Sequence, residues 1–142
     1  MRRIYFLCTG NSCRSQMAEG FAKRILGPDW QVASAGVEVH GVNPLAVQVM
    51  AEAQAPITGQ TSKLIDPDYL RQCAVVVTLC GNARDRCPRL PAGVRQLHWP
   101  LPDPAQATGT STERLAAFRA VRDDLQQRIE ALAITLNGAD TL

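Results

Sequence analysis

The chain has 142 residues, which is the size of one ordinary domain and too short for two independent hydrophobic cores. Hydrophobic residues make up 46% of it and charged residues 20%, the composition of a folded globular protein. The 15 Lys and Arg against 13 Asp and Glu leave a net charge of +2, too small to indicate binding to nucleic acid or to an anionic membrane. The apolar runs are too short for a membrane-spanning helix or a signal peptide.

Four segments have the pattern of β-strands, and helical segments alternate with them. The expected strands are residues 3–8, 31–35, 74–80 and 94–99. The expected helices are residues 14–26, 44–54 and 68–73, followed by a long C-terminal helix after the capping-box pair Thr110 and Glu113. The first and third strands are almost continuously apolar, as in a parallel sheet covered on both faces. We therefore expect one α/β domain over residues 1–142, with a four-stranded parallel open sheet and helices on both faces.

Three reactive side chains follow the carboxyl ends of these strands. Cys8 ends the first strand, Cys80 ends the third, and Asp103 comes just after the fourth. Because open α/β sheets bind ligands at this edge, we expect the three side chains to converge there.

The segment from Cys8 to Arg14 has the pattern of an oxyanion-binding loop. A cysteine, five residues and an arginine lie between a strand and a helix, so backbone N–H groups and the helix N-terminus can hold a tetrahedral anion. The Arg14 fork can bind two of its oxygens, and Ser15 can donate to a Cys8 thiolate. The competing interpretation is a buried cysteine beside a surface arginine. The five intervening residues are Thr9, Gly10, Asn11, Ser12 and Cys13.

The chain contains five cysteines, an odd number that does not suit a closed disulfide framework. We expect a reducing, cytoplasmic location, with Cys13 and Cys73 structural and the Cys13 side chain directed away from the anion. Cys80 and Cys87 would lie roughly 10 Å apart if the segment between them is helical, whereas a disulfide needs Cα atoms within about 7 Å. They could bond only after it unwinds, which Gly81 and the prolines after Cys87 would allow. The alternatives are two unrelated cysteines in one loop and, less well matched by the spacing, a zinc site.

Asp103 stands between two prolines in a stiff loop. A carboxylic acid beside the anion site could protonate an oxygen leaving the substrate, although an Asp next to Pro is also common in simple turns. His98 and Trp99 are expected to finish a strand and pack. His40 is either a substrate-side or a surface residue.

The stretch CTGNSCRSQMAEG resembles the low-molecular-weight protein tyrosine phosphatases, and more closely the thioredoxin-coupled arsenate reductases built on the same fold. The resemblance continues through SAGVEVHGVNP, TSKLID, VVTLC with a second cysteine seven residues later, HW and DP, and so covers nearly the whole chain. It implies a low-molecular-weight phosphatase-like fold.

The resemblance also implies a function. Arsenate would bind the loop in competition with phosphate or sulfate, Cys8 would attack it, and Asp103 would act as the acid. Cys80 and Cys87 would pass the disulfide outward to thioredoxin, without a bound cofactor, in a monomer that binds neither nucleic acid nor membrane. A glutathione-linked or other thiol reductant stays open. The alternative functions are a phosphotyrosine phosphatase and a non-catalytic oxyanion or arsenite-binding regulator.

Several such reductases bind potassium near the loop, and one ligand position differs here. The equivalent residues are Asn11, Glu19, Ser34 and Thr61, with Lys63 where the family has an aspartate. An ammonium group at Lys63 would oppose a bound cation and could act beside Glu19 in its place. We therefore expect no metal requirement and little dependence on potassium. The alternative is that Lys63 simply points to solvent.

Overall fold

The core of the molecule is a four-stranded parallel sheet. The computed structural model describes residues 1–87 and 89–139, so Pro88 and the last three positions of the expected domain lie outside the described residues. The strands are β1 Arg2–Cys8, β2 Trp30–Gly36, β3 Val75–Thr78 and β4 Arg95–His98. They are ordered β2-β1-β3-β4, and every neighbouring pair is parallel. This confirms the predicted sheet.

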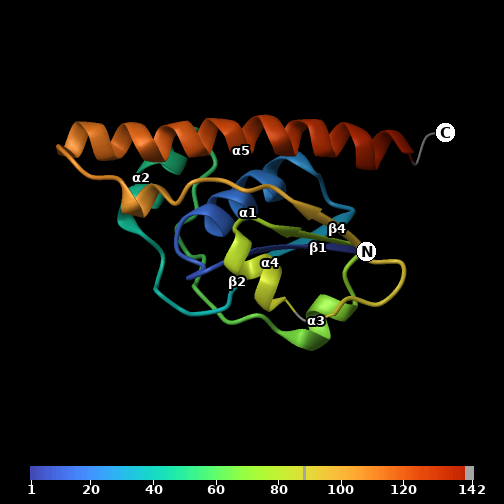
Figure 1. Cartoon of the computed structure of the whole chain (residues 1–142). Coiled ribbons are helices and arrows are strands. Elements are labelled where there is room, and N and C mark those ends of the chain that lie inside the picture. The colour runs from blue at the N-terminus through green and yellow to red at the C-terminus, as the bar shows by residue number, and fades with distance from the viewer. Residues whose placement is uncertain (88, 140–142) are drawn as a thin grey trace.

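Helices cover both faces of the sheet, as predicted (Figure 1). The long helix α5 packs over α1 on one face, while α3 and α4 lie on the other. The helices are α1 Arg14–Ile25, α2 Pro44–Glu52, α3 Pro67–Arg71, α4 Gly81–Arg86 and α5 Ser111–Ala139, with a short 3-10 helix, η1, at Pro104–Gln106.

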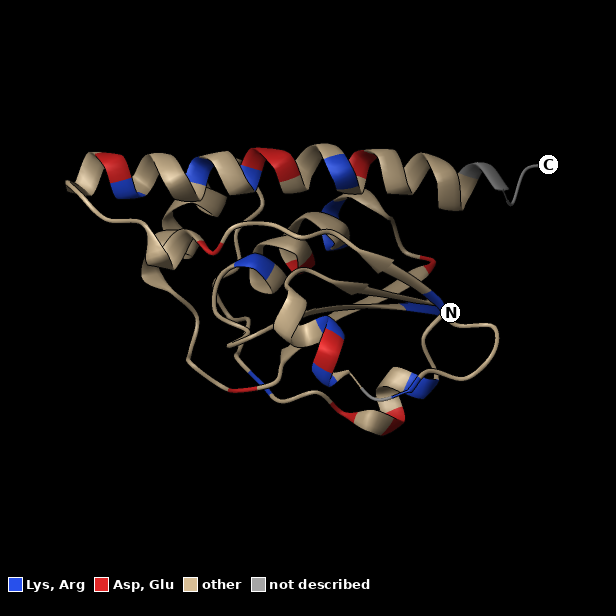
Figure 2. Ribbon diagram, viewed as in Figure 1, with Lys and Arg blue, Asp and Glu red and all other residues tan. Residues whose placement is uncertain are grey.

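The N-terminus of α5 has the predicted capping box. The Thr110 hydroxyl accepts from the Glu113 backbone N–H at 3.1 Å, and the Glu113 carboxylate accepts from the Thr110 N–H at 3.2 Å. Acidic and basic residues are interspersed along α5 (Figure 2). Within the described part of the chain, no helix is both long and apolar enough to cross a bilayer.

The third strand is shorter than expected. It ends at Thr78, whose carbonyl accepts from the Trp99 N–H at 2.8 Å, and the Leu79 carbonyl accepts from the Leu101 N–H at 3.2 Å. The chain then turns, so Cys80 becomes the N-cap residue of α4 rather than the last strand residue. The apolar pattern continues through Leu79 and Cys80 because both are buried, although neither belongs to the strand.

Candidate active site

The loop between β1 and α1 curls tightly at the carboxyl edge of the sheet. Asn11 has a φ of 49°, in the left-handed region that non-glycine residues seldom adopt. α1 begins directly after the loop, and its N-cap residue, Cys13, makes no side-chain hydrogen bond to the helix. The first N–H groups of the helix are therefore left for another acceptor, the arrangement that suits an anion.

A segment after β2 holds the backbone of this loop in place. We call residues 37–43 the buttress. Its N–H groups donate to four loop carbonyls, in the pairs Val37 to Cys8, Glu38 to Thr9, His40 to Gly10 and Asn43 to Ser12, at 2.8–3.3 Å. In a trans peptide the C=O and N–H point in opposite directions, so bonding the carbonyls to the buttress turns the loop N–H groups the other way. The role of the buttress was not predicted, although its sequence, VEVHGVN, lies within one of the stretches that carry the family resemblance.

The loop surrounds a cavity of about 220 Å³. Cys8, Arg14 and Asp103 all contribute to its wall, so the predicted nucleophile, anion ligand and acid meet at one place. The lining residues are Cys8, Thr9, Gly10, Ser12, Cys13, Arg14, His40, Asp103, Ala105 and Gln106. His40, for which two interpretations were open, lines this cavity and is also exposed at the surface.

The Cys8 thiol is buried and contacts Ser15. Its Sγ lies 2.8 Å from Ser15 Oγ, and Ser15 Oγ in turn accepts from the Asn11 side-chain amide at 2.8 Å. Because Asn11 occupies one acceptor site of the hydroxyl, the Ser15 hydrogen is free to point at the sulfur. Ser15 is thus placed to donate to a Cys8 thiolate, as expected from the sequence.

Arg14 and Asp103 face each other across the cavity. One guanidinium nitrogen of Arg14 donates to the Leu101 carbonyl at 3.1 Å, and another lies 3.7 Å from Asp103 Oδ2. The other oxygen of Asp103 accepts from the Ala105 N–H at 3.0 Å, which fixes the carboxyl at the start of η1. Asp103 therefore caps a turn, as one interpretation expected, and it also lines the cavity, while its role as the acid stays a prediction.

Cys13 also lines the cavity. Burial raises the pKa of its thiol to about 12, so this group stays protonated at neutral pH. It remains a predicted structural residue, and the direction of its side chain relative to a bound anion remains a prediction. Cys73 belongs to the buried core, as predicted, and burial raises its pKa to about 11.

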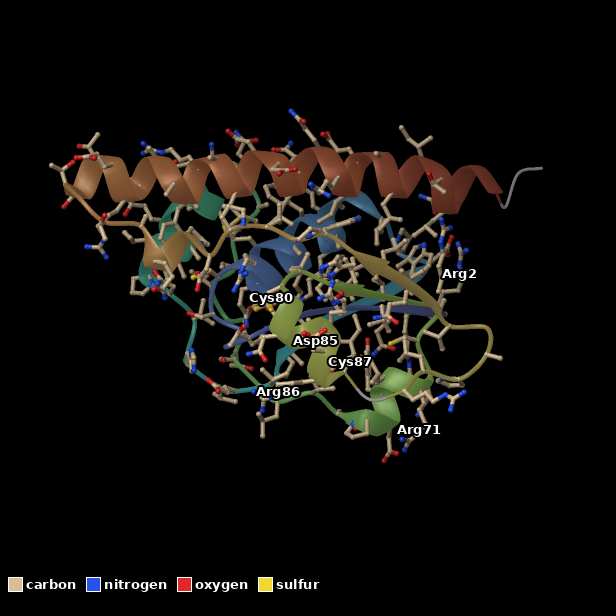
Figure 3. All side chains as sticks on the ribbon, in the orientation of Figure 1. Arg2, Arg71, Cys80, Asp85, Arg86 and Cys87 are labelled. Carbon is tan, nitrogen blue, oxygen red and sulfur yellow. The ribbon has the colours of Figure 1, made fainter. Side chains whose placement is uncertain are left out.

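Cys80 joins α4, which we call the relay helix after the relay expected of its two flanking cysteines, to the loop. Its Sγ lies 3.2 Å from Thr9 Oγ1 and accepts from the Ala83 N–H at 3.3 Å, so the sulfur caps the helix that it begins. Cys87 follows α4 at its other end (Figure 3). The helix rise puts its Cα about 10 Å from the Cα of Cys80. Burial raises the pKa of Cys87. The segment is helical while both thiols are free, the condition under which we expected the two cysteines to be unable to bond.

The residues equivalent to a potassium site form a closed hydrogen-bond network instead. Asn11 donates to Ser34 at 3.0 Å, and Ser34 donates to Glu19 at 2.6 Å. Glu19 pairs with Lys23 at 2.5 Å, which corrects the expectation that Lys63 would act beside it. Lys23 lies one helical turn after Glu19 on α1, at the i,i+4 spacing that favours such a pair.

Lys63 has a different partner. Its ammonium donates to the Thr61 carbonyl at 3.2 Å, and that carbonyl also accepts from the Gln16 side chain at 3.0 Å. Two ammonium groups and several N–H donors thus occupy the oxygens that a cation would need. These residues do not fit a potassium ion.

Two of the remaining candidates lie outside the cavity. His98 ends β4 and its Nδ1 lies 2.8 Å from Thr78 Oγ1, while Trp99 packs against the core beside Phe6, as expected for residues that finish a strand.

A cysteine at the end of a parallel strand, followed by a tight loop and a helix N-terminus around a cavity, is an arrangement of α/β proteins that can hold a tetrahedral oxyanion, and this chain has that arrangement. The family model described as low molecular weight phosphotyrosine protein phosphatase matches residues 3–141. The chain belongs to this family.

Within the family, the similar proteins include arsenate reductases. An arsenate reductase of Bacillus licheniformis is 55% identical over 134 residues, which cover 94% of this chain and 96% of that protein. A solved arsenate reductase in a phosphate-binding state is 36% identical, with a TM-score of 0.77 over 95% of this chain and 98% of its own. Another, in an oxidized state, is 33% identical, with a TM-score of 0.79 and the same coverage of both chains.

Proposed function

We propose that this protein reduces arsenate to arsenite, with Cys8 as the nucleophile and Cys80 and Cys87 as a thiol–disulfide relay. The observation that carries the proposal is the contact between Cys80 and the anion loop, where its sulfur lies 3.2 Å from the Thr9 hydroxyl. A hydrolytic phosphatase needs Cys8, Arg14 and Asp103 but has no use for a second thiol at that position. The arsenate reductases among its relatives support the same activity.

The first step takes place in the cavity. Arsenate has the charge and shape of phosphate, so the loop N–H groups and Arg14 can hold it. The Cys8 thiolate attacks arsenic and a sulfur–arsenic bond forms. Asp103 gives a proton to the departing oxygen, which leaves as water.

The second step moves two electrons to arsenic. The Cys80 thiolate attacks the Cys8 sulfur, a disulfide forms, and the sulfur–arsenic bond breaks. The bonding electron pair stays on arsenic, which leaves as arsenite. Two thiols have then been oxidised for each arsenate reduced, so the electron count closes.

The third step depends on α4. Once its sulfur is in a disulfide with Cys8, Cys80 can no longer cap the helix, and a lost N-cap costs on the order of 1 kcal/mol. A helix of six residues has little stability of its own, so it unwinds and Cys87 can reach Cys80. Cys87 attacks, Cys8 is released as a thiolate, and a Cys80–Cys87 disulfide remains.

An external thiol reductant must then reduce the Cys80–Cys87 disulfide, with one dithiol or two monothiols supplying the two electrons. The family resemblance favours thioredoxin, which would require a reducing cytoplasm, and a glutathione-linked thiol is the alternative. Following NADPH oxidation after arsenate is added, with thioredoxin and its reductase or with glutathione and its reductase, separates the two. Turnover with glutathione alone would contradict thioredoxin coupling.

The relay itself is tested by Cys87→Ser. This variant should reduce about one equivalent of arsenate and then stop, with two thiols lost per chain and Cys8 joined to Cys80, as read by thiol titration and mass spectrometry. Cys73→Ala is the matched control, because it removes a buried thiol outside the relay and should keep multiple turnovers. Sustained turnover of Cys87→Ser with thioredoxin would rule out the relay, and no thiol loss in the wild type would favour a phosphatase or a non-catalytic binder.

A further inference from the structure

Glu38, in the buttress, contacts a different side chain with each of its two carboxylate oxygens. Its Oε2 lies 2.7 Å from His40 Nε2, and its Oε1 lies 3.8 Å from a guanidinium nitrogen of Arg86. His40 lines the anion cavity, whereas Arg86 is the last residue of α4. One side chain therefore touches both the substrate wall and the relay helix.

The His40 ring is seated directly on the loop. A Cβ added at Gly10 would lie 2.3 Å from His40 Nδ1 and 2.6 Å from its Cγ, so the ring occupies the space over that glycine. The His40 backbone N–H also donates to the Gly10 carbonyl at 3.0 Å. With one ring nitrogen bonded to Glu38 and the other against Gly10, the imidazole has a fixed place in the cavity wall.

Arg86, at the end of α4, contacts the buttress through Glu38. It lies at the outer end of α4, near the loop that follows β2 (Figure 3). There it lines a shallow hollow with Val37, Leu64 and Ile65, next to Glu38. An arginine stem covers apolar surface while its charged end reaches an acid, so both halves of this side chain hold the end of α4.

We propose that Glu38 is a positioning residue that couples the anion cavity to the relay helix. With one oxygen it holds His40 against the loop, where the imidazole forms part of the cavity wall that shapes the oxyanion site. With the other it keeps the end of α4 wound through Arg86 while both relay thiols are free. The proposal rests on the proposed relay for its purpose, because only a relay requires α4 to unwind.

The test uses fully reduced protein and no turnover, so it does not depend on the relay. Hydrogen exchange of the peptide that contains residues 80–87 reports the opening of α4, and titration calorimetry with inorganic phosphate reports the cavity. Glu38→Ala should speed exchange up to about five-fold, the range of an exposed ion pair, and weaken phosphate binding about two- to ten-fold. Glu38→Gln, which can still accept from His40, should speed exchange and leave phosphate affinity nearly unchanged.

Substitutions of Arg86 and His40, the two partners of Glu38, separate the effect on hydrogen exchange of α4 from the effect on phosphate binding. Arg86→Met keeps the apolar stem but loses the charge, so it should speed exchange as Glu38→Gln does and leave phosphate affinity within two-fold. Arg86→Lys should restore slow exchange. His40→Gln should weaken phosphate binding and leave α4 exchange unchanged.

Arg84→Met is the matched control. Arg84 is on the same helix and equally exposed, but it pairs with Asp85 and should have no effect on either measurement. An effect of Arg84→Met equal to that of Arg86→Met, or no effect of Glu38→Ala on both measurements, would overturn the coupling. Failure of the relay would appear elsewhere, as the absence of thiol loss after arsenate is added.

Discussion

The anion loop and the relay helix lie at the same edge of one sheet, yet they are held in opposite ways. In the loop, the Asn11 side chain is fully buried and bonds Ser15, Ser34 and the Lys63 backbone, at 2.8–3.0 Å. In α4, Ala83 is the one fully buried residue, and the helix begins on a sulfur cap. In the proposed reaction the loop keeps its geometry when an anion arrives, whereas α4 gives its geometry up.

This difference follows from how many contacts each segment would have to lose. Opening the loop would strand buried donors and acceptors, each at a cost of about 1–3 kcal/mol. Opening α4 exposes little apolar surface and breaks few hydrogen bonds, because a helix of six residues has few to break. A disulfide relay therefore needs only a small free-energy change to move Cys87.

The largest effect we predict comes from the nucleophile. Cys8→Ser should reduce arsenate-dependent thiol loss below detection, because a serine hydroxyl at this site is a far weaker nucleophile than a thiolate and cannot enter a disulfide. The protein should still fold and bind phosphate, as read by calorimetry. Arsenite production by this variant would place the reaction outside the loop.

An Asn→Ala substitution in the anion loop and another in α4 compare the stability contributions of the two regions directly. Asn11→Ala should lower the free energy of unfolding by roughly 3 kcal/mol, from unsatisfied buried partners and the left-handed backbone, and should abolish phosphate binding. Asn82→Ala, on the exposed face of α4, should change it by less than about 0.5 kcal/mol. Urea unfolding of the reduced proteins measures both. Equal losses would contradict the contrast between the regions.

A smaller effect is predicted outside both regions, where α2 meets α5. Hydrogen bonding from Arg119 lowers the pKa of Glu52 to about 2, with Arg122 adding to the effect. A carboxyl with a lowered pKa in the folded state stabilises the protein above its ordinary value of 4.5, and this stabilisation fades as the pH falls toward 2. Glu52→Gln should therefore lower Tm slightly near neutral pH, because the pair is exposed and screened by solvent.

The difference in Tm between Glu52→Gln and the wild type should shrink steadily below a pH of about 4.5. Thermal unfolding across that range measures it, and a constant difference would contradict the linkage. Because Glu52 is remote from both regions, arsenate-dependent thiol loss should be unchanged in this variant.

The smallest effect concerns potassium, for which we predict almost none. Lys23 pairs with Glu19, and Lys63 bonds the Thr61 carbonyl, so a cation would have to displace both ammonium groups. Replacing sodium by potassium at fixed ionic strength should leave kcat/KM unchanged. A several-fold rise would show that the loop network opens to admit a cation.

Much of the fold was predictable because its signals are local. The apolar runs of β1 and β3, the capping box at Thr110 and the proline at the start of α2 each act over a few residues. The convergence of Cys8, Cys80 and Asp103 followed from the prediction of a parallel sheet, since the carboxyl ends of parallel strands lie at one edge.

The remaining features depend on contacts between distant residues, which a single sequence does not reveal. The pair of Glu19 with Lys23 has a local signal, the i,i+4 spacing on α1, which was overlooked, whereas the contact of Lys63 with the Thr61 carbonyl has none. The buttress is a run of backbone donors, and backbone atoms carry no sequence signature. The place of Glu38 between His40 and Arg86 likewise depends on where α4 lies after folding.

The close fit of His40 over Gly10 means that the anion loop is not a portable motif. A designer who moved the seven residues from Cys8 to Arg14 onto another sheet would transfer the nucleophile without the segment that turns its peptide groups toward the substrate. Libraries that vary position 10 would favour glycine unless position 40 varied with it, since a Cβ there requires the His40 ring to move. The transferable unit is the pair of segments, 8–14 and 37–43.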